Sequence, residues 1–354
     1  MYTMFMKQCA FWADQLNKSM EFWTEMSNPP VKKEWTTKNT IKLKLGNTNL
    51  RDFSTGKCDN PILIVDPQAG HMNVSDYGPD QSLAEAALKS GISEVYAEEW
   101  KSCTFDRRNE GIDDFIISMK KSIEAIGKPV TLIGLCQGGW QSAIYTALYP
   151  EHVKKLVLAG APIDFHACDS KIGAYAKYTP MSVYETAVMM QGGLIRGEYM
   201  VSAFKALNPV DRYFIDPLNL WLDICNKDEN AKRSAITRKR NFRNWYEFGV
   251  QNIPGKFYLE AVRMFKDNTL VKGDMIICGR KVDLSTITCP LYLIAGEKDD
   301  ISPAPQLFNM EKYVNSKEVF KLMVPAGHIG VFMGKKIIQN YWPSIFSQVS
   351  PLNS

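Results

Sequence analysis

The segment Gly134-Leu135-Cys136-Gln137-Gly138-Gly139 constrains the fold of this chain more than any other feature. An apolar run at residues 130–133 precedes it and a stretch with helical character follows, so we expect a strand, a tight turn and a helix to meet at Cys136. Glycines two positions on either side of the cysteine let the strand and the helix approach closely. This is the pattern of a nucleophile elbow, which makes Cys136 the candidate nucleophile. The alternative is a buried cysteine in a glycine-rich turn.

A cysteine nucleophile needs a base, and the chain has four histidines. His328 lies just past the apolar segment 319–323, which we interpret as the last strand. When nucleophile, acid and histidine follow in that order, the base lies in the loop after the last strand. His328 is therefore the candidate base, and a histidine beside a cysteine favours the reactive thiolate. His166 is a second candidate, and His152 is expected on the surface.

The acid of such a triad is expected after another apolar strand, at residues 291–295. The loop that follows contains Asp299 and Asp300, and we favour Asp299 as the group that orients the histidine. Asp164, at the end of the preceding strand, is the remaining alternative. Adjacent aspartates in such a loop also cap helices, and a helix is expected here near Pro303.

Acyl transfer also needs backbone donors for the developing oxyanion. In the predicted arrangement one is the amide of Gln137, directly after the nucleophile, and the other comes from the loop Pro67-Gln68-Ala69-Gly70-His71. Ala69 is our candidate, while the choice among Gln68, Ala69 and Gly70 stays open. We expect His71, Trp140 and Ile329 to contact substrate, although His71 is equally explained as a polar loop residue.

Apolar or β-branched runs alternate with amphipathic stretches along the chain. The runs lie at 61–66, 93–98, 130–135 and 153–159, and residues 112–126 form a helical pattern. This alternation predicts the α/β class and, with the elbow, an α/β-hydrolase fold, in which a mainly parallel sheet carries helices on both faces. Residues 40–45 and 49–53, joined through Gly46-Asn47, predict an antiparallel hairpin at the leading edge of the sheet.

The stretch 165–288 is too long to be one crossover connection and predicts a lid inserted into a core formed by 31–164 and 289–354. Its many aromatic and methionine side chains suit either a pocket for an apolar acyl chain or the core of the lid itself. The lid also carries a basic cluster. That cluster is either a phosphate-binding site, for example for coenzyme A, or a solvated helix face. Its members are Lys232, Arg233, Arg238, Lys239, Arg240 and Arg243.

Composition excludes several other classes. With 354 residues, 45% of them hydrophobic, the chain is large enough for an enzyme core with a lid. The net charge of +4 is modest, and no nucleic-acid-binding module is found. Eight cysteines without a CxxC pair predict a reducing compartment and no zinc or other metal site. No secretory signal and no apolar run of about eighteen residues or more is found, so we expect a cytoplasmic protein without a transmembrane segment, working without a cofactor.

These motifs resemble the branch of the α/β hydrolases that contains polyhydroxyalkanoate synthases and intracellular polyhydroxybutyrate depolymerases, both of which use a cysteine nucleophile. The elbow at 134–139 resembles the synthase motif. The segments 67–71, 160–164, 296–302 and 327–334 look closer to the depolymerases. Synthases usually follow their histidine with an Asn-Pro-Pro run, which is absent here. The resemblance extends from about residue 35 to the end and is weak in the lid.

The resemblance implies a covalent acyl-enzyme on Cys136, formed with the help of His328 and Asp299. We expect a carboxylic ester hydrolase that cleaves 3-hydroxyalkanoate polymers or oligomers. The first alternative is a synthase, an acyltransferase that uses 3-hydroxyacyl-coenzyme A, and the second is a non-catalytic granule-associated protein. No motif reports directly which acceptor takes the acyl group.

Residues 1–30 predict a separate amphipathic helix that ends at Pro29-Pro30. Its apolar side chains recur at three- and four-residue steps and form a single stripe. We expect the stripe to pack on the chain's own domain or on a partner subunit, as in a homodimer. Docking onto a membrane or a polymer granule is the alternative. The stripe comprises Phe5, Cys9, Trp12, Leu16, Met20 and Trp23.

Overall fold

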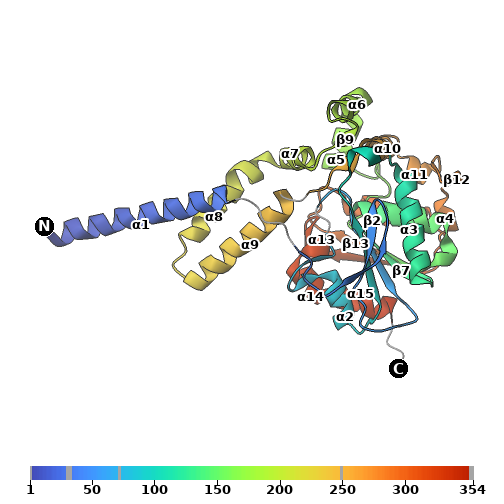
Figure 1. Ribbon diagram of the computed structural model, residues 1–354, viewed down its shortest axis with the longest axis horizontal. Coiled ribbons are helices and arrows are strands. Elements are labelled where there is room, and N and C mark those ends of the chain that lie inside the picture. Colours follow the sequence, from blue (N-terminus) through green and yellow to red (C-terminus); the bar gives the residue numbers. More distant parts are fainter. Residues whose placement is uncertain (1, 29–33, 71–72, 248–249, 351–354) are drawn as a thin grey trace. The chain divides into compact units, whose positions relative to one another are not determined.

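An eight-stranded sheet with the order β1-β2-β6-β3-β7-β8-β13-β14 organises the larger part of the chain. The computed structural model describes residues 2–28, 34–70, 73–247 and 250–350 (Figure 1). The chain divides into two compact units, a larger one of residues 34–197 and 251–354 and a smaller one of residues 1–33 and 198–250. The sheet lies entirely in the larger unit.

The sheet is parallel except at its leading edge. β1 pairs antiparallel with β2, β2 pairs antiparallel with β6, and the other neighbours are parallel. The predicted mainly parallel sheet and its antiparallel hairpin are thus confirmed. Every residue of β3, β7 and β13 is buried, as expected for strands covered on both faces. The strands are β1 Thr40–Lys44, β2 Thr48–Asp52, β3 Ile62–Val65, β6 Val95–Trp100, β7 Val130–Leu135, β8 Val153–Ala159, β13 Leu291–Gly296 and β14 Val319–Val324.

Several strand boundaries differ from the sequence expectation by one or two residues, and the end of β6 shows why. The run 93–98 predicts a strand that ends at Glu98, whereas β6 continues to Trp100. The strand continues through its two glutamates because both carboxyl groups find partners on β2. Thr48 Oγ1 donates to Glu98 Oε2 at 2.6 Å, and Arg51 Nε donates to Glu99 Oε2 at 2.7 Å. A paired carboxyl group is tolerated inside a sheet where an unpaired one is not.

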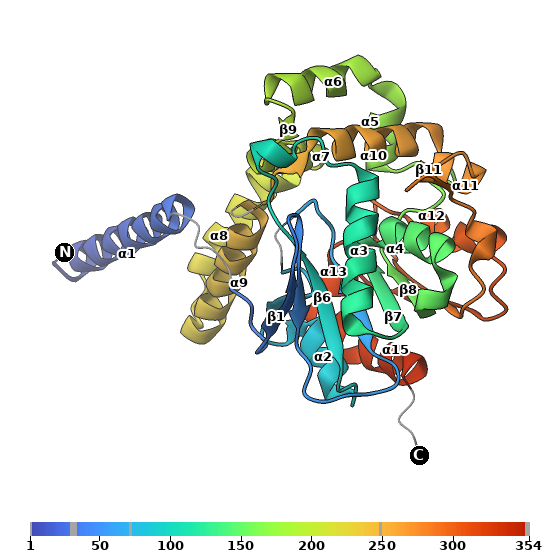
Figure 2. The ribbon, with the colours of Figure 1, turned by 45° about the vertical axis from the view of Figure 1, so that its right-hand side comes forward.

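Helices cover both faces of this sheet. α3 packs beside α4 on one face, and α2 packs beside α15 on the other (Figure 2). The predicted helix at 112–126 is confirmed as α3, whose buried residues include Ile112, Ile116, Met119 and Ile123 at helical spacing. The helices are α2 Leu83–Lys89, α3 Ile112–Ile126, α4 Gln137–Leu148, α5 Lys171–Tyr178, α6 Met181–Met190, α10 Gly255–Asp267, α11 Thr269–Lys272, α12 Ala304–Phe308, α13 Gly330–Met333, α14 Lys335–Asn340 and α15 Trp342–Val349.

Short elements complete the larger unit. Within the described residues, three two-stranded antiparallel ribbons form outside the main sheet. Their strands are β4 Asp76–Gly78, β5 Gln81–Ser82, β9 Leu194–Ile195, β10 Ile253–Pro254, β11 Ile276–Ile277 and β12 Arg280–Lys281. Single 3₁₀ turns lie at η1 Phe105–Arg107, η2 Pro150–His152, η4 Leu284–Thr286 and η5 Asn309–Lys312.

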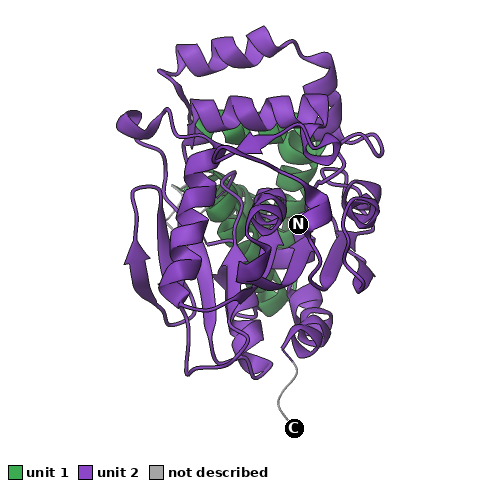
Figure 3. Ribbon diagram, turned by 90° about the vertical axis from the view of Figure 1, so that its right-hand side faces the viewer, with its two compact units in different colours: residues 1–33, 198–250 green, residues 34–197, 251–354 purple. Residues whose placement is uncertain are grey.

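The smaller unit is helical and joins the N-terminal segment to the middle of the predicted lid (Figure 3). Phe22 of the first helix packs edge-on against Trp221, with ring centroids 5.9 Å apart, and beside a small cluster of Leu220, Ile224 and Ile236. The remaining lid residues, 165–197 and 251–288, belong to the larger unit. The domain boundaries inferred from the sequence stay a prediction. The elements are α1 Tyr2–Ser27, α7 Gly197–Leu207, the π-helix η3 Asp211–Ile215, α8 Asp216–Ile224 and α9 Glu229–Glu247.

The basic cluster of the lid lies on α9, and most of its charges already have partners within the smaller unit. Lys232 pairs with Glu21 at 2.7 Å and Lys239 with Asp223 at 2.5 Å. Arg240 pairs with Glu25 of α1. Arg243 donates to the carbonyl oxygens of Glu25, Met26 and Asn28. These contacts favour a structural role for the cluster over phosphate binding, because a phosphate would have to displace the carboxylates.

Candidate active site

Cys136 occupies a strained turn between β7 and α4. Its φ of 50° and ψ of −114° lie outside the regions that side-chain-bearing residues ordinarily adopt. Two backbone hydrogen bonds hold the turn: Cys136 N–H donates to Ala159 O at 3.0 Å, and Gly139 N–H donates to Cys136 O at 2.9 Å. The predicted meeting of strand, tight turn and helix is confirmed here, and the strain lifts the cysteine above the end of the sheet.

The glycines around the cysteine are required by close backbone contacts. A Cβ on Gly138 would lie 2.1 Å from Val65 O, and one on Gly139 would lie 2.2 Å from the Cβ of Ala161. A Cβ on Gly134 would lie 2.5 Å from the Cα of Gly139. No side chain fits at these distances, so the local sequence specifies the turn through the absence of side chains.

His328 and Asp299 reach Cys136 from the other half of the sheet. His328 follows β14, and its Nε2 lies 3.1 Å from Cys136 Sγ. The Nδ1 of the same ring lies 2.9 Å from Asp299 Oδ2. The ring of Phe332 packs edge-on against the imidazole with centroids 5.7 Å apart. The structure thus brings together the three residues predicted as a triad, in hydrogen-bonding sequence. Their catalytic roles stay a prediction.

The surroundings of the two aspartates distinguish between them. The Asp299 side chain is fully buried, and its Oδ1 accepts backbone N–H groups from Ile301 at 3.0 Å and Ser302 at 2.8 Å. Asp300 is half exposed and pairs with Lys171 at 2.6 Å. Asp299 therefore has one oxygen fixed by the backbone and the other directed at the histidine, whereas Asp300 forms a surface ion pair.

Asp164, the alternative acid, is engaged elsewhere. Its carboxylate accepts hydrogen bonds from Asn268 Nδ2, Asn309 Nδ2 and the Tyr313 hydroxyl, each at 2.9 Å. Burial alone would raise the pKa of Asp164, but these three donors and the backbone N–H of His166 outweigh it and hold the pKa below its ordinary value. Asp164 is thus a buried acceptor that connects its own loop to the segments containing Asn268, Asn309 and Tyr313, which no sequence motif relates to it.

In the described part of the chain, neither His166 nor His152 makes a hydrogen bond to Cys136. His166 lies on an exposed segment, with its Nε2 3.1 Å from the carbonyl oxygen of Lys266. His152 is partly buried rather than on the open surface, since its Nδ1 lies 2.7 Å from the Tyr145 hydroxyl. His328 is the histidine that lies within hydrogen-bonding distance of Cys136.

The electrostatics around Cys136 and His328 favour a protonated histidine beside the cysteine sulfur. Burial alone would lower the pKa of His328, but the adjacent Cys136 and Asp299 raise it well above its ordinary value of 6.5 through charge and hydrogen bonding. A protonated histidine beside a cysteine sulfur stabilises a thiolate. The arrangement can therefore deliver a sulfur nucleophile and later return a proton to a leaving group.

The two residues that carry the candidate oxyanion donors are in contact, and one of the donors is already occupied. Gln137 begins α4, where the first helical N–H groups have no partner within the helix. The N–H of Ala69 donates to the side-chain Oε1 of Gln137 at 2.9 Å. Deeper in the structure, Gln68 pairs with Gln141, one helical turn beyond Gln137. The sequence analysis missed both glutamine contacts, for which the spacing of 137 and 141 on one helix face was the available signal.

The three predicted substrate-contacting residues have different surroundings. Trp140 is fully buried, stacked on Phe257 at 5.8 Å and edge-on to Phe265 at 6.5 Å, so a contact with substrate would require α10 to move. Ile329 is partly exposed directly after His328. His71 lies outside the described residues.

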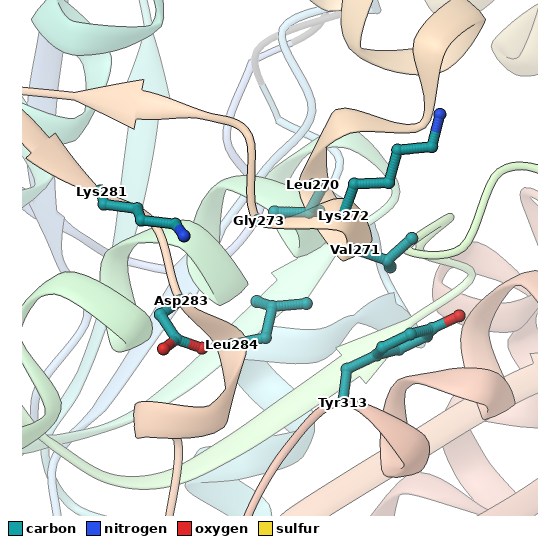
Figure 4. Close-up of a pocket in the computed structure, with 8 residues that line it drawn as sticks. All are labelled: Leu270, Val271, Lys272, Gly273, Lys281, Asp283, Leu284 and Tyr313. Carbon is teal, nitrogen blue, oxygen red and sulfur yellow. The ribbon is translucent and has the colours of Figure 1, made fainter.

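A separate small cavity of about 180 Å³ lies away from these residues and shares none of them (Figure 4). The side chain of Lys272 extends away from the other lining residues. Tyr313, at its edge, donates to Asp164 rather than to the triad. This cavity therefore adds nothing to the candidate site. It is lined by Leu270, Val271, Lys272, Gly273, Lys281, Asp283, Leu284 and Tyr313.

Two absences hold for the described part of the chain. In residues 2–28, 34–70, 73–247 and 250–350, no group of three or more histidine, cysteine, aspartate or glutamate side chains is arranged to hold a metal ion. Over the same ranges, none of the helices combines the length and the apolar character needed to cross a membrane.

Comparisons with known proteins relate this geometry to families. A family model described as "Protein of unknown function (DUF3141)" matches residues 45–352. The chain is 27% identical over 293 residues to the poly(3-hydroxyalkanoate) polymerase subunit PhaC of Allochromatium vinosum, covering 80% of this chain and 79% of that protein. It is 24% identical over 295 residues to the corresponding subunit of Haloferax mediterranei, covering 81% of this chain and 58% of that protein.

Solved structures support the fold. The chain matches the monoacylglycerol lipase of Paleococcus ferrophilus with a TM-score of 0.52 at 15% identity, covering 85% of this chain and 98% of that one. It matches mouse alpha/beta hydrolase domain-containing protein 10 with a TM-score of 0.52 at 15% identity, covering 88% and 98%. The predicted α/β-hydrolase fold is confirmed, and similarity at this level says nothing further about chemistry.

The comparisons also correct the functional expectation. The predicted resemblance to the branch containing polyhydroxyalkanoate synthases is confirmed, since the curated relatives are named as polymerases. The expected hydrolysis of polymer esters, and with it the description as a depolymerase-like hydrolase, is contradicted by the same names. Four short loop segments favour the depolymerases, whereas the similarity to the polymerases extends over about four fifths of the chain.

Proposed function

We propose that this chain, which belongs to the protein family of unknown function DUF3141, is an acyltransferase that builds poly(3-hydroxyalkanoate) from 3-hydroxyacyl-coenzyme A. The observation that carries the proposal is similarity to named polymerase subunits over 80% of the chain. The geometry agrees with it, because a cysteine paired with a histidine suits repeated formation and breakdown of a thioester.

The first half-reaction would load the enzyme. The Cys136 thiolate attacks the thioester carbonyl carbon, and the oxyanion that develops is stabilised by backbone N–H groups at the start of α4 and in the loop after β3. Collapse of this intermediate breaks the bond to coenzyme A sulfur. His328 gives its proton to the departing thiolate, and the acyl group stays on Cys136 as a thioester.

The second half-reaction would extend the polymer. The terminal hydroxyl of a hydroxyacyl chain attacks the acyl-enzyme carbonyl while His328 takes the hydroxyl proton. The new ester bond forms as the bond to Cys136 sulfur breaks. Asp299 keeps the Nδ1–H tautomer of the imidazole, so that Nε2 faces the reacting atoms in both steps.

Product analysis tests this proposal. Purified protein receives 3-hydroxybutyryl-coenzyme A in one tube and 3-hydroxybutyryl oligomers in another, with Cys136→Ala as control. Release of coenzyme A together with lengthening oligomers, seen by mass spectrometry and absent in the control, is the expected result. Free hydroxy acid from the oligomers without lengthening would overturn the proposal.

We further propose that α1 docks the enzyme onto an apolar surface such as a polymer granule. Phe5, Trp12, Leu16, Met20 and Trp23 recur on one stripe of α1, and each residue is at least 60% exposed. A contiguous apolar stripe of this size is typical of an interaction surface. A homodimer through the same stripe is the competing outcome of the test.

The two outcomes are separated by substituting Trp12→Glu and Trp23→Glu together. Loss of co-sedimentation with granules at an unchanged molar mass in light scattering would support docking. A change from dimer to monomer would instead assign the stripe to self-association and overturn the docking proposal. The exposed Lys7→Glu on the same helix serves as the control for added negative charge.

A further inference from the structure

The oxyanion loop of the larger unit is tied to α4 by two glutamines that lie one helical turn apart. Gln137, at the first turn, accepts the Ala69 N–H through its side-chain oxygen at 2.9 Å. Gln141, at the second turn, meets the side chain of Gln68. The two contacts involve neighbouring loop residues but differ in burial and in the group that they engage.

The Gln68–Gln141 contact is a buried anchor. As whole residues, Gln68 is 3% exposed and Gln141 is 0% exposed. Their side-chain amides bond reciprocally, and Gln68 Nε2 donates to Gln141 Oε1 at 2.7 Å. Gln141 Nε2 also lies 3.2 Å from the main-chain oxygen of Gln137. Buried amide groups that satisfy each other hold their backbones in one arrangement. This pair therefore fixes the loop against α4 without help from the Gln137 side chain.

The Gln137 contact is of another kind. Gln137 is only partly buried, and its side-chain carbonyl oxygen bonds the backbone N–H that was predicted to stabilise the oxyanion. Chemically, this amide oxygen stands where a substrate carbonyl oxygen would accept the same hydrogen bond. The resting site is thus occupied by a group of the protein itself.

We propose that the Gln137 side chain is a displaceable placeholder that fills the Ala69 oxyanion donor until substrate arrives. The neutral amide oxygen holds the donor weakly, whereas an oxygen that gains negative charge accepts the same hydrogen bond about twice as strongly. Displacement therefore becomes more favourable as the tetrahedral intermediate forms. The identity of the carbonyl substrate rests on the proposed function, but the placeholder itself requires only acylation of Cys136.

The placeholder has a measurable consequence. If the donor is free in only a fraction of the molecules, the apparent affinity for a carbonyl ligand falls by that fraction. Removing the competing oxygen raises the rate of acylation, whereas loosening the anchor lowers it. Gln137 and Gln141 should therefore respond in opposite directions to the same substitution.

The test uses the full chain and p-nitrophenyl acetate, a small activated ester whose attack by Cys136 needs the oxyanion donors but not the proposed substrate. The variants are Gln137→Met and Gln141→Met, with Gln8→Met on the exposed part of α1 as the matched control. Iodoacetamide alkylation of Cys136 reports the state of the thiol, because that displacement forms no oxyanion. We expect Gln137→Met to raise the second-order acylation rate constant about two- to tenfold, and Gln141→Met to lower it about tenfold.

A second readout follows the donor itself. In protein labelled with ¹⁵N-alanine, the amide resonance of Ala69 should shift in Gln137→Met and, in the wild type, on acylation of Cys136. If Gln137→Met lowers acylation or leaves it within twofold while alkylation is preserved, the placeholder is disproved. Should the methionine variant fail to fold, Gln137→Ala replaces it. If the variants respond to p-nitrophenyl acetate as expected but the protein is inactive toward 3-hydroxybutyryl-coenzyme A, the proposed function is disproved and the placeholder proposal is not.

Discussion

The Nδ1 atom of His328 lies 2.9 Å from Oδ2 of Asp299, while the other oxygen of that carboxylate is held by two backbone N–H groups. This relationship orients the imidazole toward the nucleophile. It also distinguishes Asp299 from the neighbouring Asp300. Asp300 differs by one position in the chain but faces a lysine at the surface. Both aspartates can be tested by the same substitution.

Asp299→Asn should reduce the acylation rate of Cys136 by about a thousandfold or more, because the amide favours the wrong imidazole tautomer and cannot stabilise an imidazolium. The matched variant Asp300→Asn removes a surface ion pair and should change the rate less than threefold. Stopped-flow acylation with p-nitrophenyl acetate measures both. A larger loss in Asp300→Asn would reassign the acid.

His328 should make the site depend on pH in a defined direction. Its pKa is raised in the folded state, so its contribution to stability is complete below its unfolded value of about 6.5 and is lost as pH rises through the folded value. The difference in unfolding free energy between wild type and His328→Ala should therefore shrink as pH rises above about 6.5. Urea denaturation across this range measures it. A difference that grows with pH contradicts the assignment.

Reactivity of Cys136 should follow the same residue. An ordinary thiol becomes reactive only at roughly pH 8 and above. With His328 protonated beside the sulfur, iodoacetamide should alkylate Cys136 rapidly well below that pH. His328→Ala should lose this advantage and react as slowly as the exposed Cys9. Peptide mass mapping of both cysteines provides an internal control within each sample. Equal, slow labelling of Cys136 in wild type and variant would exclude an activated nucleophile.

Asp66, which directly follows β3, should lower stability at neutral pH. Burial raises its pKa to about 8, against hydrogen bonds from Ser75 that lower it, so the folded protein holds a proton there that the unfolded chain releases above about pH 4. The unfolding free energy should therefore fall as pH rises from about 4 to 8. Asp66→Asn should remove about 2 kcal/mol or more of this total decrease between pH 4 and pH 8. An unchanged slope in urea titrations at several pH values would contradict a neutral Asp66.

The glycine contacts at the elbow predict intolerance to a single methyl group. Gly139→Ala forces its Cβ to 2.2 Å from that of Ala161 and should cost about 2 kcal/mol or more. The exposed Gly46→Ala meets nothing closer than a side-chain carbon at 4.0 Å and should be neutral within about 0.5 kcal/mol. Thermal unfolding of the two variants compares them directly. Similar melting temperatures would show that the turn relaxes more than the geometry implies.

Local features of this protein can be predicted from the sequence because contiguous residues determine them. The turn at Cys136 depends on glycines within three positions of it, and the strands β7 and β8 match their predicted runs from end to end. The order of nucleophile, acid and histidine follows from the order of strands in a parallel sheet. Short loop motifs were a weaker guide: they favoured hydrolysis, whereas similarity along most of the chain favours the synthase alternative.

What remained open depended on contacts between distant segments. The choice between Asp299 and Asp300 rests on which carboxylate faces a histidine 29 positions away along the chain from Asp299. The pairing of Ala69 with the side chain of Gln137, and the burial of Trp140 under α10, join segments that sequence spacing does not relate. The sequence by itself determined the elbow, the course of the main strands and the candidates for the triad, since these follow from turn geometry and hydrophobic pattern. Only the tertiary structure decided which polar groups meet, because hydrogen bonds form within about 3 Å and depend on the position of the folded backbone.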